Sequence, residues 1–414
     1  MNGSLEEIAK AVGCKRYPAR WQLIFEEAMA RYAETGNPLA DPAYYDRLQE
    51  TYGCMGQYLE LYKETARQTA AEDALSRFLF LLSLALREKE NRKGDIGELA
   101  LLEVPEGKDP LAYNMVTGLA VCSQLDEGNE TLTARGFPEA YRRSCLKTAV
   151  GCGVNSYMRL HGGEPGYRLL GWAQHYLAGK MCMIGRLEVE FDCVFKGHGS
   201  VYERFDGQQI ALAKDITLHR SGFALGSRHY EDSDGAWEPV LEENDVSVTG
   251  YPYLESGAVS RQPVTLLRKE WKRVLTEGDP VIGLHIPERP GQPLTPEAVD
   301  STLAEVETVA AAIGYDYRGF TCHSWIMDPQ VGEITGQQSN LARFSGRFRK
   351  MTLKSPGENV FVFVFKRPNL DFSLESLPEN TRLERGIKQH YLAGKAIYDV
   401  FGYFSKKDPK GERV

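Results

Sequence analysis

Two histidines stand near the ends of stretches that have the apolar character of buried strands. His285 lies in "PVIGLHIP" and His323 lies in "GFTCHSWIM". Imidazole is the side chain best suited to accept and return a proton near neutral pH. If the two strands are neighbours, both rings lie at strand carboxyl ends, where open α/β sheets usually bind ligands. We predict His285 and His323 as catalytic residues, against the alternative that each is a buried, hydrogen-bonded structural residue.

The loop and helix after the first of these strands predict an anion site. The sequence "ERPGQPLT" ends in Thr295, a good N-cap residue, and Pro296 suits the first helical position. A helix start presents unpaired N–H groups and the positive end of the helix dipole, which together bind phosphate. The predicted pyrophosphate contacts are Arg289, Gly291, Gln292, Leu294 and Thr295. The alternative is a rigid loop that only caps the helix, because Pro290 and Pro293 have no N–H to donate.

Three further side chains are predicted to contact the substrate. Trp325 can wall a substrate pocket, although a core tryptophan is an equally good interpretation. In "QQSNLARF", Asn340 can donate to a carbonyl and Arg343 can hold a carboxylate or a phosphate. A helix cap and a solvated charge are the alternatives for these two. Asp328 and Ser324 are candidates to orient His323.

A long polar stretch in the middle of the chain is predicted to form the substrate side. It reads "HRSGFALGSRHYEDSDGAWEPVLEENDVSVTGYPYLESG" and is rich in aromatic residues. Long loops of this kind often carry function. The alternative is a hairpin insertion with an exposed turn.

The elements that must position these residues change character along the chain. Segments such as "PARWQLIFEEAMARYAE" and "TAAEDALSRFLFLLSLALREKE" have helical spacing of apolar residues, and the second is apolar on most faces, which is typical of a buried helix. Strand-like alternation begins after Lys180, with "CMIGRLEVEFDCVF" read as one strand. "GQQIALAKDITLH", "NDVSVTGYPY" and "RQPVTLLRK" are further strand candidates.

The last third predicts strands alternating with helices. "GQPLTPEAVDSTLAEVETVAAAIG" is a helix, "NVFVFVFKR" is read as a central strand, and "AIYDVFGYF" as the last strand. In "LPENTRLERGIKQHYLAG", Thr381 and Glu384 have the spacing of a capping box. The predicted fold class is α+β, with an all-α domain over residues 1–155 and a mixed α/β sheet domain over residues 156–414.

The heptamer "QHYLAGK" occurs twice, at residues 174–180 and 389–395. Its flanking sequences are not alike, so a duplicated domain is not indicated. Each copy ends an amphipathic stretch, and Gly179 and Gly394 suit the left-handed conformation that stops a helix. The heptamer therefore predicts two helix ends and no chemistry.

Composition excludes several classes of function. The net charge of −8 over 414 residues argues against a general nucleic-acid surface. Neither a membrane span nor an apolar signal core is apparent, so a cytoplasmic location is expected. None of the eight cysteines forms CxxC or CxxH, and two distant histidines without a paired carboxylate make a poor metal site, so no metal is predicted.

Several stretches carry a family resemblance that covers most of the chain. They are "GDPVIGLHIPERPGQPLTPEAVDSTLAE", "FTCHSWIMDPQ", "QQSNLARF" and "LPENTRLERGIKQHYLAG". The chain resembles a bacterial family that joins a helical N-terminal acyltransferase domain to a GNAT-like C-terminal domain. The resemblance implies a mixed sheet that opens around acyl-coenzyme A (acyl-CoA), with the strand before "HIP" and the following helix at the cofactor edge.

The resemblance implies transfer of an acyl group from acyl-CoA to an amine or hydroxyl of a small-molecule acceptor. Most GNAT enzymes have an Arg/Gln-x-x-Gly-x-Gly/Ala loop, whereas this chain has "RPGQPL" with one glycine. That departure favours an alternative, a catalytically inactive GNAT-like protein that binds a small ligand. The oligomeric state is left open.

Overall fold

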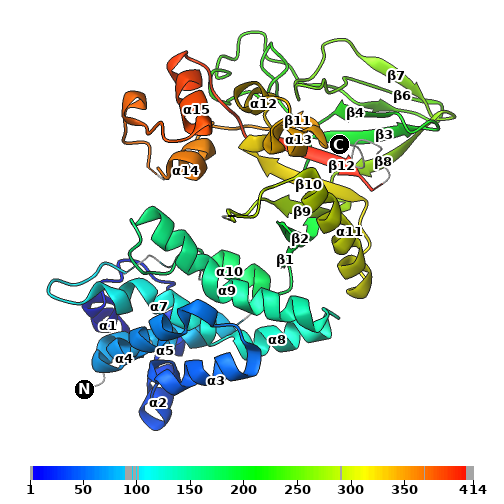
Figure 1. Cartoon of the computed structure of the whole chain (residues 1–414). Helices are drawn as coiled ribbons and strands as arrows, with labels where there is room; N and C mark the ends of the chain where they lie inside the picture. The colour runs from blue at the N-terminus through cyan, green and yellow to red at the C-terminus, as the bar shows by residue number, and fades with distance from the viewer. Residues whose placement is uncertain are drawn as a thin grey trace. The chain divides into compact units, whose positions relative to one another are not determined.

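The computed structural model describes residues 3–88, 96, 99, 102–289, 291–367 and 369–406. The chain divides into two compact units, Met1–Met183 and Ile184–Val414. Residue 155, the boundary expected from the sequence, lies inside the helix Glu139–Leu160. An α+β fold class is confirmed, with a helical first unit and a sheet-containing second unit (Figure 1).

The described part of the first unit is built from helices. They are α1 (Leu5–Ala11), α2 (Trp21–Thr35), η1 (Pro38–Ala40), α3 (Pro42–Tyr52), η2 (Gly56–Tyr58), α4 (Leu59–Ala71), α5 (Asp73–Arg87), α7 (Pro110–Cys122), α8 (Leu125–Ala134), α9 (Glu139–Leu160) and α10 (Leu170–Leu177). Helix α5 buries residues on most of its faces, as its continuous apolar sequence predicts. Gly179 ends α10 with φ of +66°, which confirms the helix end predicted from the heptamer.

The second unit contains a sheet of six described strands in the order β1-β2-β9-β10-β12-β11. Their bounds are β1 (Met181–Ile184), which straddles the boundary between the units, β2 (Leu187–Val194), β9 (Pro280–His285), β10 (Gly319–Ser324), β11 (Arg349–Thr352) and β12 (Val400–Ser405). Strands β9 and β10 are parallel, whereas β2 with β9, β10 with β12 and β11 with β12 are antiparallel. The stretch predicted as one strand after Lys180 is thus two strands, because Gly185 turns the chain between them with φ of +50°.

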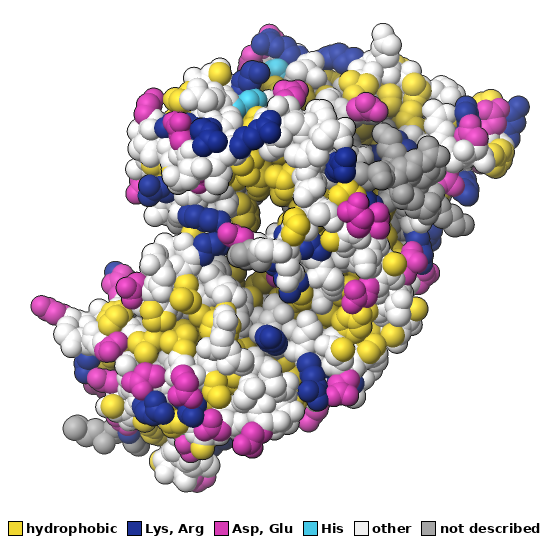
Figure 2. Space-filling model, in the orientation of Figure 1, with side chains coloured by type: hydrophobic (Ala, Val, Ile, Leu, Met, Phe, Trp, Pro, Cys, Tyr) yellow, Lys and Arg dark blue, Asp and Glu magenta, His cyan; other side chains and the backbone are white. Residues whose placement is uncertain are grey.

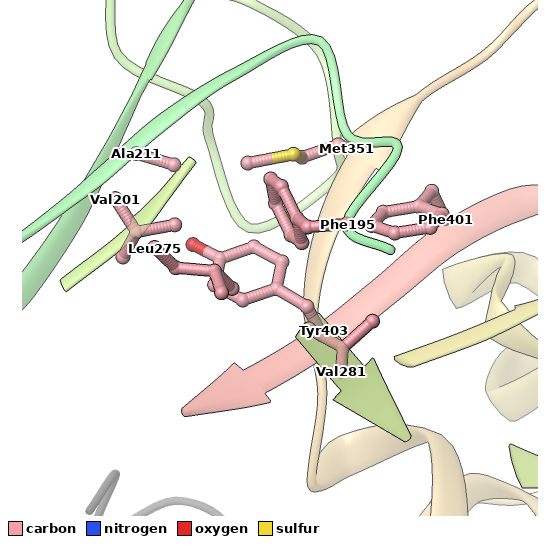
Figure 3. Packing of buried hydrophobic residues seen from close by; sticks show 8 residues of the cluster. All are labelled: Phe195, Val201, Ala211, Leu275, Val281, Met351, Phe401 and Tyr403. Atoms are coloured by element: carbon pink, nitrogen blue, oxygen red, sulfur yellow. The ribbon is translucent and has the colours of Figure 1, made fainter. Parts of the chain in front are cut away.

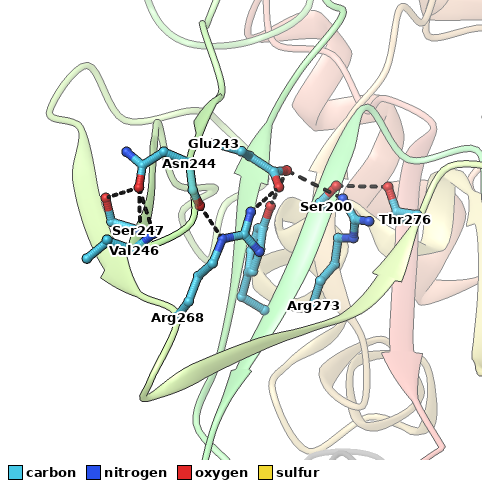
Figure 4. A network of polar contacts seen from close by, with 9 residues as sticks. Ser200, Glu243, Asn244, Val246, Ser247, Arg268, Arg273 and Thr276 are labelled. Atoms are coloured by element: carbon cyan, nitrogen blue, oxygen red, sulfur yellow. Dashed lines mark hydrogen bonds and ion pairs between the residues drawn. The ribbon is translucent and has the colours of Figure 1, made fainter.

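Two smaller sheets lie in the described part of this unit. One has the order β4-β3-β8 and the other β5-β6-β7. Their bounds are β3 (Gly199–Arg204), β4 (Gln209–Ala213), β5 (Glu242–Glu243), β6 (Ser247–Gly250), β7 (Val264–Leu267) and β8 (Trp271–Thr276). Glu243 joins them, since it accepts from the Tyr202 hydroxyl at 2.9 Å and pairs with Arg268 at 2.7 Å and Arg273 at 3.4 Å (Figure 4).

The first small sheet packs against one face of the six-stranded sheet. Val201, Ala211 and Leu275 come from the small sheet, and they bury a common core with side chains of β9, β11 and β12 (Figure 3). The side chains from the large sheet are Val281, Met351, Phe401 and Tyr403. Burial of this kind supplies the main stabilisation of the unit.

Helices cover or flank the large sheet. They are α11 (Pro296–Ala312), η3 (Trp325–Met327), α12 (Pro329–Thr335), α13 (Asn340–Gly346), α14 (Asn359–Phe365), η4 (Leu374–Ser376) and α15 (Arg382–Leu392). Helix α11 packs against β2, and Tyr315 after it contacts Phe191 on the face opposite the small sheet. The Thr295 N-cap of α11 and the capping box of Thr381 and Glu384 in α15 are both confirmed.

The prediction that "NVFVFVFKR" forms a central strand is wrong. Asn359–Phe365 instead form α14, which buries Val360, Phe361 and Phe365. Phe361 contacts the rings of Phe372 and Tyr391 at centroid distances of 5.2 and 4.7 Å, so packing overrides the strand propensity of this sequence. The place beside β12 is taken by β11.

On the face shown in Figure 2, Lys and Arg side chains are interspersed with Asp and Glu. Among the described helices, none combines the length and the apolarity needed to cross a bilayer. The cytoplasmic location stays a prediction.

Candidate active site

The parallel strands β9 and β10 part before they end. Their ladder pairs Ile282 with Phe320 and Gly283 with Thr321. Beyond these pairs, β9 stays paired with β2 as far as His285, and β10 stays paired with β12 as far as Ser324. The backbone groups that face each other at the carboxyl ends of β9 and β10 are therefore not used by this ladder, and they can bond a ligand that lies between the strands.

The two predicted histidines lie on the same face of the sheet at this opening. Since Gly283 is level with Thr321, His285 and His323 are level two residues further on. Residues level in a ladder project to the same face, and the side-chain period of a strand is two. Phe401, which is opposite His323, belongs to the core against the small sheet, so both histidines share that face.

Glu190 of β2 completes a pair with His285. The Nε2 atom of His285 lies 3.0 Å from Oε2 of Glu190, so one proton is shared along this contact. A β-bulge between Glu190 and Cys193 places Asp192 at φ of +59°. Gly283 leaves room for the carboxylate, because a Cβ there would lie 3.2 Å from the Glu190 Cβ.

The pKa of His323 is lowered from its usual value. Its ring reaches solvent, yet enough protein surrounds it that burial is the main cause. The Asp399 carboxylate opposes this effect, and the positive charges of His285 and Lys196 add to it. No hydrogen bond to the ring is found among the described residues. The lowered pKa of His323 favours the neutral form of its imidazole near pH 7, which is the form that can accept a proton.

Two arginines converge beside the start of α11. Arg186 donates to the carbonyl oxygens of Gln292, at 2.6 Å, and Pro287, at 2.9 Å, and Arg289 donates to Gly185 O at 2.8 Å. Burial and the charge of Arg289 lower the pKa of Arg186. Two guanidinium groups held this close to a helix start form a positive site that an anion would stabilise.

The other predicted cofactor residues lie along the same loop. Gly291 has φ of +76° with open space around it, and the N–H of Gln292 donates to Arg289 O at 3.1 Å. Leu294 is buried, and the Thr295 hydroxyl accepts from Ala298 N at 3.2 Å. Gln292 therefore has only its exposed side-chain amide to offer a ligand.

The three predicted substrate residues lie after β10. Trp325 is buried in η3 and is 6% exposed. Asn340 is the first residue of α13, whose N-cap is Ser339. Arg343 donates to Gln338 Oε1 at 2.8 Å, and its charge acts on Glu297 in the first turn of α11. Arg343 therefore lies near the start of α11, where the anion site is formed.

Glu190 and Arg186 were missed by sequence reasoning. Glu190 lies 95 positions from His285, and Arg186 lies 106 positions from Gln292. The only signal was the position of Glu190 on the polar side of an alternating strand. The pairing of β2 with β9, which brings these residues together, is not readable from local sequence.

The sequence of the second unit matches a known protein family. A family model, the GNAT-like C-terminal domain, matches residues 181–404, which is more than half of the chain. The chain belongs to the GNAT-like C-terminal domain family. Within this GNAT-like domain, β9, β10 and α11 form the opening and the anion site described above.

Solved structures with a similar fold match nearly the whole chain, including the helical unit. One is an acyltransferase mutant in complex with octanoyl-CoA, with a TM-score of 0.61 and 17% identity over 97% of this chain and 99% of that chain. Another is an acyltransferase in complex with decanoyl-CoA and teicoplanin, with a TM-score of 0.60 and 18% identity over 97% and 98%. No curated protein matches the sequence.

A metal centre in the GNAT-like domain would need a cluster of ligating side chains. Among the described residues, no group of three or more His, Cys, Asp and Glu side chains is arranged to hold a metal ion. The carboxylate that sequence reasoning did not find beside a histidine is present in Glu190, and it forms a pair with His285.

Proposed function

We propose that the protein is an acyltransferase that moves an acyl group from acyl-CoA to an amine or hydroxyl of a small-molecule acceptor. The observation that carries the proposal is the parting of β9 and β10, with His285, Glu190 and His323 at the opening. The anion site of Arg186 and Arg289 supports binding of the CoA phosphates. The likeness to acyltransferases crystallised with acyl-CoA and with teicoplanin supports both the donor and a small-molecule acceptor.

Acyl-CoA, when bound, supplies an acyl group activated as a thioester. His323 is the proposed base that takes the proton from the acceptor, because its lowered pKa keeps it neutral. His285 is the proposed proton donor to the leaving sulfur, and Glu190 holds the ring in place through Nε2. We propose that the amide groups of the pantetheine arm and the thioester carbonyl bond to backbone groups at the strand ends that the ladder between β9 and β10 does not use.

Binding is the first test. A thermal-shift series with CoA, acetyl-CoA and octanoyl-CoA is expected to stabilise the protein, since a ligand at 100 times its Kd adds about 2.7 kcal/mol of apparent stability. S-acetyl-N-acetylcysteamine, a thioester without phosphates, is expected to give a much smaller shift at equal concentration. If no CoA derivative changes the Tm, the proposal fails.

Replacing Arg289 by methionine is expected to weaken CoA binding by about tenfold or more. A charge-assisted hydrogen bond contributes about 1.5–3 kcal/mol, and the phosphate would lose this partner. Titration calorimetry gives the Kd. The matched control is Arg318→Met at the opposite end of the sheet, where Arg318 pairs with Asp279 at 3.3 Å. Equal Kd values for both variants and the native protein would remove Arg289 from the site.

The protonation of His323 can be followed without any activity. NMR titration of the imidazole is expected to give a pKa below 6.5, because burial lowers it. Lys196→Met removes a positive charge that lowers this pKa, so the variant is expected to titrate at higher pH. A pKa at or above 6.5 in the native protein would contradict the assignment of His323 as a neutral base.

A binding protein without catalysis is the second candidate. It is favoured by the hydrogen bonds that already occupy Arg186, Arg289 and the N–H of Gln292 within the loop. Release of free thiol from octanoyl-CoA in a mixture of amine and alcohol acceptors separates the two. Binding with no thiol release from any acceptor would support the binding protein.

A further inference from the structure

Asp399 is a carboxylate on the same face of the sheet as the two histidines. It lies directly before β12 and is 6% exposed. In the ladder between β10 and β12, His323 pairs with Phe401 and Ser324 pairs with Val400. Side chains on a strand alternate between the two faces, so Asp399, two positions before Phe401, projects to the face of His323 as its diagonal neighbour.

The electrostatics of His323 agree with this placement. The Asp399 carboxylate raises the pKa of His323, against the larger lowering effect of burial. A negative charge has this effect when it lies close enough to favour the protonated ring. Strand register and charge therefore both place Asp399 beside the imidazole at the opening between β9 and β10.

The described residues use only one oxygen of the Asp399 carboxylate. Oδ2 accepts from the Ser355 hydroxyl at 3.2 Å and from the Asn359 side-chain amide at 2.9 Å. The N–H of Asp399 donates to the Ser355 hydroxyl at 2.9 Å, so backbone and side chain are held together. Oδ1 has no hydrogen-bond partner among the described residues. One acceptor oxygen is thus fixed in place and left for a ligand.

No cation among the described residues forms an ion pair with Asp399. Lys196, whose charge also acts on His323, is exposed and does not pair with it. Arg228 has its guanidinium over the Tyr391 ring at 5.7 Å and does not pair with it either. Both hydrogen-bond donors to Asp399 are neutral groups, so the charge is solvated in part but is not cancelled. Since a largely buried carboxylate without a cation is costly, a bound cation would stabilise the protein.

We infer that Asp399 binds the acceptor as the ammonium form of an amine and holds its nitrogen beside His323; this inference rests on the proposed function. Diagonal neighbours in a sheet lie about 7–8 Å apart, a spacing that lets one ammonium group contact both side chains. A hydroxyl acceptor carries no charge, so it gains less from the carboxylate than an ammonium does. Asp399 therefore selects amines over alcohols.

The bound nitrogen must lose two protons during the transfer. An ammonium has no lone pair, so one proton first goes to His323, which passes it to water. The neutral nitrogen then forms a C–N bond to the thioester carbonyl carbon as the C–S bond breaks. Its second proton goes to His323, and the departing thiolate takes a proton from His285. After both histidines exchange with water, the products are an amide, free CoA thiol and one released proton.

The pKa of His323, followed by NMR, reports a bound cation without any activity. Butylammonium chloride is expected to lower this pKa relative to sodium chloride at equal ionic strength, because a cation on Asp399 cancels the charge that raises it. Asp399→Asn keeps an oxygen for Ser355 and Asn359 but lacks the charge. Its His323 is expected to titrate at lower pH than in the native protein and to be insensitive to butylammonium. Butan-1-ol is expected to have no effect on either protein.

Two further variants separate the charge of Asp399 from its structural contacts. Ser355→Ala removes a neutral donor and keeps the carboxylate, so it is expected to retain the butylammonium effect. Glu358→Gln is the matched control, because it removes an exposed charge next to Asn359 in the chain. With octanoyl-CoA as donor, Asp399→Asn is expected to raise the KM for butylamine by about tenfold, and Glu358→Gln is expected to leave it unchanged.

A pKa of His323 that butylammonium does not change, or lowers equally in the native protein and in Asp399→Asn, overturns the inference. Titration of octanoyl-CoA on the same samples tests the proposed function separately. Octanoyl-CoA binding without an Asp399-dependent butylammonium effect refutes the ammonium site alone. The butylammonium effect without octanoyl-CoA binding refutes the acyltransferase proposal and leaves Asp399 as an ammonium site. An unchanged octanoyl-CoA Kd in Asp399→Asn also shows that its GNAT-like domain is folded.

Discussion

Replacing His323 by alanine is expected to lower kcat for acyl transfer by about 100-fold or more, with the Kd for acyl-CoA nearly unchanged. General-base catalysis contributes about 10²–10⁴-fold to rate. His323 is suited to this role because its ring has a lowered pKa and stands at the opening between β9 and β10. The measurement is thiol release from octanoyl-CoA with a saturating acceptor, beside calorimetric titration of octanoyl-CoA.

The pH dependence distinguishes a base from a packing residue. In the native protein, kcat/KM is expected to fall as pH drops through the lowered pKa of His323, because the protonated ring cannot accept a proton. This acidic limb is expected to disappear in His323→Ala. His198→Ala, a half-buried histidine after β2, is the matched control and is expected to keep both the rate and the limb. An unchanged rate in His323→Ala would remove His323 from the mechanism.

Local signals in the sequence predicted the ends of elements well. The N-cap at Thr295 with Pro296 after it, and the capping box of Thr381 and Glu384, depend on residues within one helical turn. The two heptamer glycines also have the predicted left-handed φ, +66° at Gly179 and +75° at Gly394. Such features are set by backbone chemistry near each residue, so no knowledge of the tertiary fold is needed.

Features that depend on strand pairing were predicted only in part. The sequence predicted the two histidines on separate strands and left open whether those strands are neighbours. In the structure they are parallel neighbours, as a strand, helix, strand order favours. Glu190 and Arg186 were not found, since their partners come from the antiparallel pairing of β2 with β9 and from the turn before β2. A one-residue slip in that pairing would turn Glu190 to the other face.

The secondary structure of the α14 segment was also mispredicted, because it depends on contacts between residues that are distant in sequence. Val and Phe have high strand propensity, which favoured a strand over "NVFVFVF". The edge of the sheet beside β12 is instead filled by Lys350 and its neighbours in β11. Phe361 finds its burial among Phe372 and Tyr391, contacts that only the folded chain reveals.

The second large effect is expected in the helical unit, where Gly153→Ala is predicted to lower the free energy of unfolding by about 3 kcal/mol. A Cβ at Gly153 of α9 would lie 2.3 Å from both Arg168 O and the ring of Tyr167. Tyr167 is fully buried, and its hydroxyl donates to Ala149 O at 2.5 Å, so neither neighbour can move aside easily. Overpacking of a core costs about 1–3 kcal/mol, and a clash with backbone belongs at the upper end of that range.

Native-state hydrogen exchange of peptides from α9 measures this effect within the helical unit. Exchange through unfolding is expected to be about 100-fold faster in Gly153→Ala, while peptides from β9 and β10 keep their native rates. The matched control is Gly171→Ala in α10, where the nearest atom to a new Cβ, Ile96 Cγ2, is at an ordinary 3.5 Å. Alanine is the better helix former by about 1 kcal/mol, so this control is expected to exchange as slowly as the native protein or more slowly. Native-like exchange in Gly153→Ala would mean that the 166–168 segment can move away from α9 at little cost.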